Sequence, residues 1–529
     1  MLRIYSLSLL YSLSISSTLA TKLQLPFKHK ASPFDDDFAS LTNWTLEQWH
    51  VPGLSIAVVD GDDIWAEGYG FASLPHTKAT PETLWFAGSL TKSFTSAAMA
   101  LLISSRNYTD LHWGTPISNL IREDFVLDDE WATAHISIED ALTHRSGMPR
   151  HDMSYGGAYD DDGHRGTPRD VVRSLRYLPL TAEPRTAFRY SNIMYVVVGH
   201  AIETLTGQWL GDFMRERLWE PLGMKATYLS RSDSLKTPND LAVGYVWQED
   251  GYYRPTPLPD IDAMTGAASL VTSVADYAKW LKAFLSHSAP LSINDYKELK
   301  TPRTLLVKQP QASPFSGYAT YALGWEVDFY HGYQVFCHTG NIEAYGCRVT
   351  FVPELHWGAV TCANNPVASS YAGTELIQYL FDNKIRLAKE EKFDWFHYHK
   401  QRWLKNIEDY NGAREKYYPR LLDKRPLSLE LERYIGTYFN PGYRNMTIYY
   451  KDGQLHIDRA CSWSIHMDLE HVTGDYFMAY TDSTTVPDSI FQRAIAAEFV
   501  IGSDGVARKF GLAAEATMGT EGRIWFERV

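Results

Sequence analysis

The chain has 529 residues, of which 45% are hydrophobic and 21% charged, as in an ordinary soluble globular protein. This length exceeds what one hydrophobic core usually serves, so two domains are expected. The formal net charge of −13 argues against a nucleic-acid partner, which would need a basic face.

Residues 1–20 predict a signal peptide and therefore a secreted protein. Arg3 supplies the positive n-region, residues 4–15 are apolar apart from serines, and Thr18-Leu19-Ala20 fits a small-residue cleavage site. The alternative is a short membrane anchor, and no later segment reaches the roughly 18 apolar residues of a membrane span. Three N-x-S/T sequons agree with a secreted glycoprotein: Asn43, Asn107 and Asn445.

Residues 54–59 and 64–67 are apolar runs around Asp60-Gly61-Asp62-Asp63, which predicts a β-hairpin. Helices are expected after Ser89, after Ser137, after Tyr190 and over 274–285. Strands return at 324–328, 333–337, 345–351 and 357–362. Strands at both ends with helices between them predict a mixed α/β (α+β) fold, with one antiparallel sheet flanked by helices.

Ser89 and Lys92 stand three residues apart at the start of the first expected buried helix. Residues at this spacing share a helix face, and the helix N-terminus favours developing negative charge. A serine hydroxyl needs a base to become a nucleophile. Lys92 can serve only when neutral, and burial works in that direction. A nearby tyrosine is the alternative base.

Residues 151–169 are rich in Gly, Asp and Tyr and predict a loop. Its acidic triplet, 160–162, lacks the spacing of a calcium loop and is interpreted as solvated surface. Residues 397–399, His-Tyr-His, lack a partnered ligand set. The sequence therefore predicts neither a metal site nor a cofactor.

Four cysteines are too few for a disulfide scaffold. If residues 354–355 form the tip of a hairpin, Cys347 and Cys362 lie directly opposite one another. A cross-strand disulfide and an apolar strand pair fit this placement equally well.

Residues 386–425 carry an excess of basic residues interleaved with aromatics and predict a helical connector. In residues 426–529, short alternating strands follow one another and predict a small β-barrel or sandwich.

Two further motifs follow Ser89 and Lys92. Tyr190-Ser191-Asn192 opens an apolar helical run, and His338-Thr339-Gly340 follows a strand-like segment. In order and spacing the three motifs resemble the class C β-lactamase and penicillin-binding-protein-like serine hydrolases. This resemblance places the catalytic domain at 21–385. More loosely, 426–529 resembles the lipocalin-like C-terminal domain of some relatives, which begins with a similar Y-x-G-x-Y segment.

The resemblance implies a nucleophile, an acid/base pair and an acyl-binding amide. Ser89 would attack the substrate, with Lys92 and Tyr190 acting jointly as acid and base. Asn192 would face the same cleft and donate its amide to the acyl side of the substrate.

The third motif implies the substrate-binding residues. His338 replaces the lysine of many relatives, so it offers a polar or titrating contact in place of a permanent cation. Gly340 would let the strand edge approach the substrate closely. Backbone N–H groups of Ser89 and Asn341 would form the oxyanion hole.

Two positions depart from the family pattern. Relatives usually have Pro-Gly ahead of Y-x-N, where this chain has Pro184-Arg185, and they are often glycine-rich where it has Asn341-Ile342-Glu343-Ala344. A carboxylate at Glu343 near the cleft mouth would disfavour anionic acyl groups.

The resulting hypothesis is a secreted serine hydrolase that cleaves an ester or amide of a small-molecule or peptide substrate through an acyl-enzyme. Acyl transfer to an alcohol or amine fits the sequence equally well. A catalytically silent binding protein of the same fold is the alternative from another class. The oligomeric state is left open.

Overall fold

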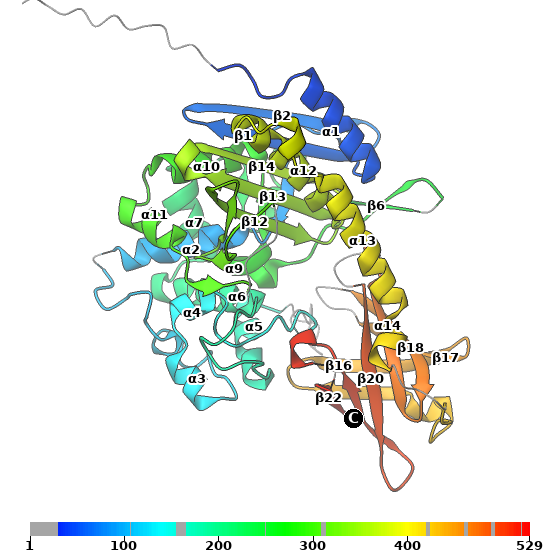
Figure 1. Ribbon diagram of the computed structural model, residues 1–529. Coiled ribbons are helices and arrows are strands. Elements are labelled where there is room, and N and C mark those ends of the chain that lie inside the picture. The colour runs from blue at the N-terminus through cyan, green and yellow to red at the C-terminus, as the bar shows by residue number, and fades with distance from the viewer. Residues whose placement is uncertain are drawn as a thin grey trace, which may run out of the picture. The chain divides into compact units, whose positions relative to one another are not determined.

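The computed structural model (Figure 1) describes residues 30–105, 107–154, 166–248, 250–307, 314–418, 424–459, 464–487, 492–519 and 521–529. The predicted signal peptide and the acidic triplet at 160–162 lie outside these residues. Pro33–Val529 form one unit, which contains every element named below.

A nine-stranded antiparallel sheet joins the two ends of the predicted catalytic region, in the order β3-β2-β1-β14-β13-β12-β11-β10-β9. The predicted hairpin is present, with β1 (Gly53–Asp60) paired to β2 (Asp63–Ser73). Strand β1 also pairs with β14 (Trp357–Ala363), for example Leu54 with Ala363. The antiparallel sheet expected from the sequence is confirmed.

The remaining strands of this sheet come from both regions of the chain: β3 (Thr77–Lys78), β9 (Thr304–Leu305), β10 (Thr320–Tyr321), β11 (Glu326–Tyr330), β12 (Tyr333–Ile342) and β13 (Tyr345–Val352). Strand β12 runs five residues beyond the predicted end, because His338 pairs with Val349 and Gly340 with Cys347 of β13. The His-Thr-Gly motif therefore lies within a strand.

Helices cover both faces of the sheet. Leu54, Ile56 and Val58 of β1 pack in one apolar cluster with residues of α1 (Asp36–Gln48) and α12 (Ala368–Lys384). Ala57 and Val59 point to the other face, where α10 (Val274–Ser286) packs against the sheet. Successive side chains of β1 thus pack into two different apolar clusters, as expected for a sheet with two buried faces.

Ser89 directly follows a strand of a small sheet that the sequence did not indicate. Its order is β4 (Trp85–Gly88), β8 (Leu270–Thr272) and β5 (Thr227–Tyr228). Two of these strands have only two or three residues, too short for a periodic signal. The helices α2 (Thr91–Ile103), α4 (Ile138–Leu142) and α6 (Asn192–Thr206) follow at the expected places, although α4 has only five residues.

The C-terminal region is a closed antiparallel barrel in which each strand pairs with the next. Its strands are β15 (Gly436–Asn440), β16 (Arg444–Lys451), β17 (Gln454–Arg459), β18 (Ile465–Thr473), β19 (Tyr476–Ser483), β20 (Arg493–Ile501), β21 (Ala507–Leu512) and β22 (Ile524–Arg528). The predicted barrel is present, but β18, β21 and β22 were missed. The helices α13 (Trp395–Asn411) and α14 (Ala413–Tyr417) precede it.

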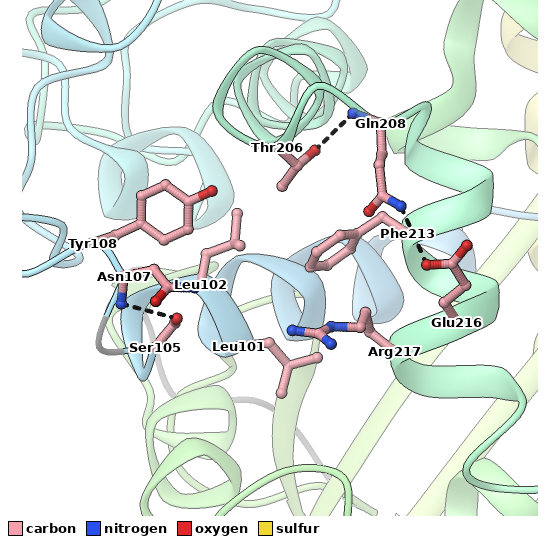
Figure 2. A pocket seen from close by; sticks show the side chains of 10 residues that line it. All are labelled: Leu101, Leu102, Ser105, Asn107, Tyr108, Thr206, Gln208, Phe213, Glu216 and Arg217. Carbon is pink, nitrogen blue, oxygen red and sulfur yellow. Dashed lines mark hydrogen bonds between the residues drawn. The ribbon is translucent and has the colours of Figure 1, made fainter.

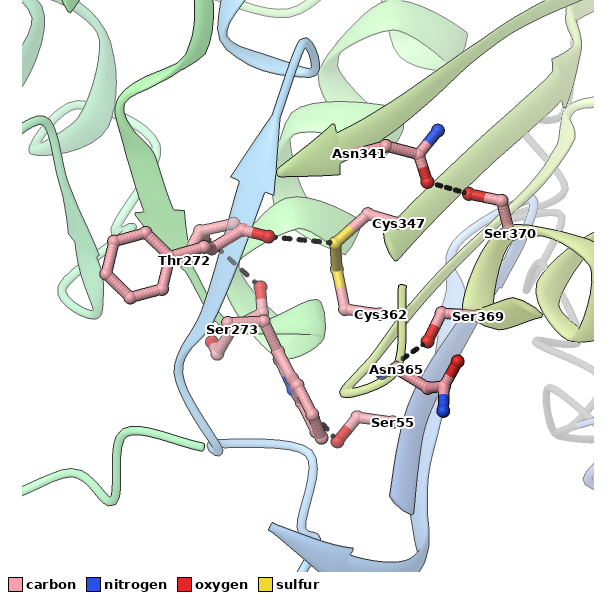
Figure 3. Close-up of a disulfide and its surroundings, with 11 residues drawn as sticks. Ser55, Thr272, Ser273, Asn341, Cys347, Cys362, Asn365, Ser369 and Ser370 are labelled. Carbon is pink, nitrogen blue, oxygen red and sulfur yellow. Dashed lines mark hydrogen bonds between the residues drawn. A yellow bond between two sulfur atoms is a disulfide. The ribbon is translucent and has the colours of Figure 1, made fainter. Parts of the chain in front are cut away.

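Cys347 and Cys362 form a disulfide across β13 and β14 (Figure 3). The hairpin tip lies at Pro353–Leu355, as the pairing argument required, and of the two alternatives the disulfide is the one observed. Within the described residues, no helix is long and apolar enough to cross a membrane.

Candidate active site

Ser89 lies in the turn between β4 and α2 and not on the helix itself. The helix begins at Thr91, after Leu90 at its N-cap, and Gly88 has a positive φ of 51° that lets the chain turn here. The Lys92 N–H donates to the Ser89 carbonyl at 3.1 Å. Lys92 is fully buried whereas Ser89 is partly exposed, so a substrate reaches the serine with the amine behind it.

Three acceptor atoms surround the Lys92 amine. Nζ lies 2.9 Å from Ser89 Oγ, 2.7 Å from Asn192 Oδ1 and 3.0 Å from the Ala267 carbonyl. Burial, reinforced by the positive charge of Arg150, lowers the pKa of Lys92 well below its usual value, against a smaller opposing effect of Asp152.

A neutral amine has two N–H groups and one lone pair. When Lys92 is neutral, the carbonyl oxygens of Asn192 and Ala267 accept its two N–H groups, which leaves the lone pair for the Ser89 hydroxyl proton. This arrangement suits a general base.

Tyr190 approaches the serine from the other side. Tyr190 stands one residue before Ser191, the N-cap of α6. Its hydroxyl lies 2.9 Å from Ser89 Oγ. Desolvation raises the pKa of Tyr190, although Arg150 partly opposes this. The sequence assigned Lys92 and Tyr190 jointly as acid and base, and burial shifts their pKa values toward a neutral amine and a protonated phenol.

Two residues that sequence reasoning did not assign to the site pack on the Tyr190 ring. The His144 ring centroid is 4.2 Å away, and the Arg150 guanidinium carbon lies 4.8 Å from the ring centroid. His144 Nδ1 accepts the Ser191 N–H at 3.0 Å, which holds the start of the Tyr-Ser-Asn motif. Neither His144 nor Arg150 is part of the three motifs that the sequence analysis assigned to the site.

The segment that carries Arg150 is bonded to the C-terminal barrel. Asp152 pairs with Arg150 Nε at 2.6 Å and lies 3.9 Å from Arg493 of β20. Arg459 of β17 donates to the Met153 carbonyl. The barrel therefore contacts the segment at two successive residues beside the catalytic groups.

His151 adds a third connection to the barrel. Its backbone N–H donates to Glu515 Oε2 at 2.9 Å, and its Nδ1 lies 2.6 Å from the Tyr443 hydroxyl. His151 is fully buried, so these bonds are shielded from water.

His338 does not offer the titrating contact that the sequence suggested. Its Nδ1 donates to the Thr339 carbonyl at 2.7 Å, and its Nε2 accepts from the Tyr321 hydroxyl at 3.0 Å. Burial and the nearby Lys92 lower the pKa of His338 to about 3. The residue is therefore neutral near pH 7 and supplies no cation to a substrate.

Gly340 lets its strand approach the turn that carries Ser89 closely, whereas the sequence suggested a close approach to the substrate. A Cβ atom at this position would lie 1.9 Å from the Ala87 carbonyl oxygen and 3.2 Å from Leu90 Cγ. One residue further on, the Asn341 side chain accepts a bond from Ser370 Oγ at 2.5 Å (Figure 3). A Cβ on Gly88 would lie 3.0 Å from the Asn341 nitrogen, so the two backbones proposed for the oxyanion hole adjoin.

The sequence profile of the Beta-lactamase family matches residues 38–378, which is more than half of the chain. The chain belongs to this family. A second profile, a domain of unknown function (DUF3471), matches residues 423–528, the region of the barrel. The chain is therefore a β-lactamase-related serine hydrolase with an additional barrel.

Two related proteins match almost the whole chain. The protein named unguisins hydrolase ungD' from Aspergillus campestris is 39% identical over 503 residues, covering 94% of this chain and 92% of the relative. Unguisins hydrolase ungD from Aspergillus violaceofuscus is 37% identical over 531 residues, covering 94% and 91%. The octameric penicillin-binding protein homologue from Pyrococcus abyssi has a similar fold, with 22% identity, coverage of 93% of this chain and 99% of that chain, and a TM-score of 0.58.

The two departures from the β-lactamase pattern have structural consequences. Arg185 adopts a positive φ of 71°, which explains why a glycine suits this position; its guanidinium binds buried Asp140 at 2.8 Å. Glu343 lies in the turn between β12 and β13. Desolvation and the charge of Asp260 raise the pKa of Glu343 to about 7, so it is only partly charged near neutrality.

A separate pocket of about 290 Å³ lies at the far end of α2 (Figure 2). Its lining includes Leu101, Tyr108 and Phe213. At 1.5 Å per residue, Leu102 is about 15 Å along the helix from Lys92, so this pocket is distinct from the serine site.

The histidines of the predicted connector form no metal site with each other. His399 is buried, stacks on Tyr371 at 4.8 Å and lies 3.6 Å from Glu375. Burial lowers the pKa of His399 to about 3, so it packs as a neutral side chain.

Proposed function

We propose that this serine hydrolase is secreted and cleaves an amide or ester bond through an acyl-enzyme on Ser89. The observation that carries the proposal is the position of Ser89 Oγ, 2.9 Å from both the Lys92 amine and the Tyr190 hydroxyl. A nucleophile held between a buried base and a protonated hydroxyl is the arrangement that acyl transfer needs.

Acylation begins when Ser89 Oγ attacks the substrate carbonyl carbon and Lys92 takes the hydroxyl proton. The carbonyl oxygen becomes negative, and the backbone N–H groups of Ser89 and Asn341 stabilise it. The bond to the leaving nitrogen or oxygen then breaks. The proton on Lys92 passes to that atom, directly or through the Tyr190 hydroxyl, so that a neutral amine or alcohol departs.

Deacylation uses the same groups in reverse. Water attacks the acyl carbon and gives a proton to Lys92, the bond to Ser89 Oγ breaks, and the proton returns to the serine. A carboxylic acid leaves and the enzyme is restored. An amine or alcohol in place of water would make the reaction an acyl transfer.

Unguisins are the substrates to test first, because both relatives that match over 90% of this chain are named unguisins hydrolases. The neutral state of His338 agrees with a substrate that needs no permanent cation from the His-Thr-Gly motif. A small-molecule or peptide substrate with an amide bond fits this proposal.

The test is turnover of an unguisin by the tag-free protein, followed by mass spectrometry of the products. We expect products whose summed mass exceeds that of the substrate by one water with wild type, and no products with Ser89→Ala. Ser105→Ala, at the separate pocket, is the matched control and should retain activity. Products that carry an added amine in place of water would establish acyl transfer, and the absence of turnover with unguisins and activated esters would contradict the proposal.

Secretion rests on residues 1–20 and agrees with the Cys347–Cys362 disulfide, since disulfides persist in oxidising compartments. N-terminal sequencing of protein from the culture medium should begin at Thr21. Recovery of the uncleaved chain in a membrane fraction would favour the short anchor.

A further inference from the structure

The outer wall of the barrel brings two histidines and an aspartate together. His456 of β17 faces Asp468 of β18 in register, and Asp458 faces His466. Alternate residues of a strand point to one side, and the intervening Leu455, Ile457 and Met467 are buried. All four polar side chains therefore share the outer face of β17 and β18.

The nitrogen and oxygen atoms converge on one point. Asp468 Oδ1 lies 2.6 Å from His456 Nδ1 and 2.9 Å from His466 Nε2, and the ligand atoms of the three residues all lie within 4.8 Å of one another. Two ligands of a tetrahedral zinc ion, each 2.0–2.1 Å from the metal, are roughly 3.3 Å apart. The two distances to Asp468 Oδ1 need to lengthen by less than an ångström to reach this separation.

Each histidine has an acceptor for its other ring nitrogen, as is usual for histidines that bind metals. His466 Nδ1 lies 2.6 Å from Asp458 Oδ1, and Tyr449 in turn donates to the second oxygen of Asp458 at 2.6 Å. His456 Nε2 lies 3.2 Å from the Lys451 carbonyl. These contacts orient both rings with one nitrogen toward Asp468.

Carboxylates outnumber imidazoles in and around this cluster. Asp458 and Asp468 contact the histidines directly, and Asp482 faces His466 from β19 in register. The uncharged Tyr449 and Tyr480 face the cluster from the strands on either side, opposite His456 and Asp468. Three carboxylates around two imidazoles provide an environment that attracts a divalent cation.

We propose that His456, His466 and Asp468 form a binding site for a divalent transition-metal ion, with zinc as the ion to test. Imidazole and carboxylate are ligands that zinc accepts, and water would complete the tetrahedron. A metal ion binds the unprotonated nitrogen of an imidazole, so protons compete with the ion for these ligands at low pH. This site lies outside the serine centre and plays no part in the acyl chemistry.

The test is calorimetric titration of the full-length, tag-free, metal-depleted protein with zinc chloride near pH 7.5. We expect one equivalent of zinc to bind, with a heat that depends on the ionisation enthalpy of the buffer. His466→Ala and Asp468→Asn should abolish this binding. Asp458→Asn, which alters only the residue that orients His466, should weaken it by about 10–100-fold.

His471→Ala is the matched control, because His471 lies on β18 and bonds to the Gly474 carbonyl. This variant should bind zinc like wild type, and cobalt should give a visible absorption band with both. Asp468→Asn keeps the size of the side chain, so its thermal unfolding shows whether the barrel still folds. The proposal is wrong if wild type shows no saturable zinc binding, or if Asp468→Asn binds zinc as tightly as wild type does.

Discussion

The Nζ atom of Lys92 lies 2.9 Å from Ser89 Oγ, while the carbonyl oxygens of Asn192 and Ala267 accept its two N–H groups. Burial lowers the pKa of Lys92 well below its usual value, which favours the neutral amine. Ser89 and Lys92 are therefore already in contact, as the proposed acylation step requires.

Replacing Lys92 by arginine should lower the acylation rate by about 10²–10⁴-fold, the usual contribution of a general base. Arginine stays protonated at any working pH and cannot take the Ser89 proton. Lys92→Met, which has a similar length and no amine, should fall to a comparable rate. Stopped-flow acylation with an activated ester measures both, with circular dichroism to verify folding, and an arginine variant within tenfold of wild type would refute a basic role for Lys92.

Replacing Arg150 by glutamine should move the acidic limb of the pH–kcat/KM profile to higher pH. The positive charge of Arg150 lowers the pKa of Lys92, so removing it lets the amine keep its proton to a higher pH. Lysine at the same position retains the charge and should restore the wild-type limb. An unchanged limb in Arg150→Gln would show that this charge does not act on the base.

Replacing Gly340 by alanine should reduce activity at least a hundredfold. The new Cβ would lie 1.9 Å from the Ala87 carbonyl oxygen, so β12 or the turn that carries Ser89 must shift. A displacement of about 1 Å at a catalytic group can lower the reaction rate about 10²-fold. The control is Gly412→Ala, where φ is −91° and the nearest atom to a Cβ is the Glu408 carbonyl oxygen at 3.2 Å, and steady-state kinetics of the two variants should differ sharply.

The sheet, the barrel and the order of the catalytic motifs were accessible from sequence. The apolar runs at 54–59 and 64–67 predict a hairpin because the turn between them is polar, and both faces of β1 are buried in the structure. That Cys347 and Cys362 lie opposite one another followed from the position of one turn, whereas the sequence left the disulfide itself open. These features depend on local pattern, which a sequence displays directly.

Features that depend on distant contacts were not accessible. Arg150 belongs to the site because it packs on Tyr190, which lies forty residues later in the chain. An ion pair with Asp152 also holds Arg150. Strand β18 was missed although its apolar and polar residues alternate, with His466 and Asp468 among the polar ones, which is a strand pattern.

Arg185→Gly should be less destabilising than Arg185→Ala by about 1 kcal/mol. Both changes remove the ion pair with Asp140, but only alanine keeps the cost of a side chain at a positive φ. Urea denaturation of the two variants, compared at equal slope, measures the difference. Equal midpoints would show that the backbone at this position carries no strain.

The most direct measurement of the central claim is the intact mass of the protein after brief exposure to an activated acyl ester. Wild type should gain one acyl group per chain, and Ser89→Ala should gain none. Acylation of Ser89→Ala to the same extent would contradict the assignment of the nucleophile, and unmodified wild type across several acyl donors would indicate a catalytically silent binding protein.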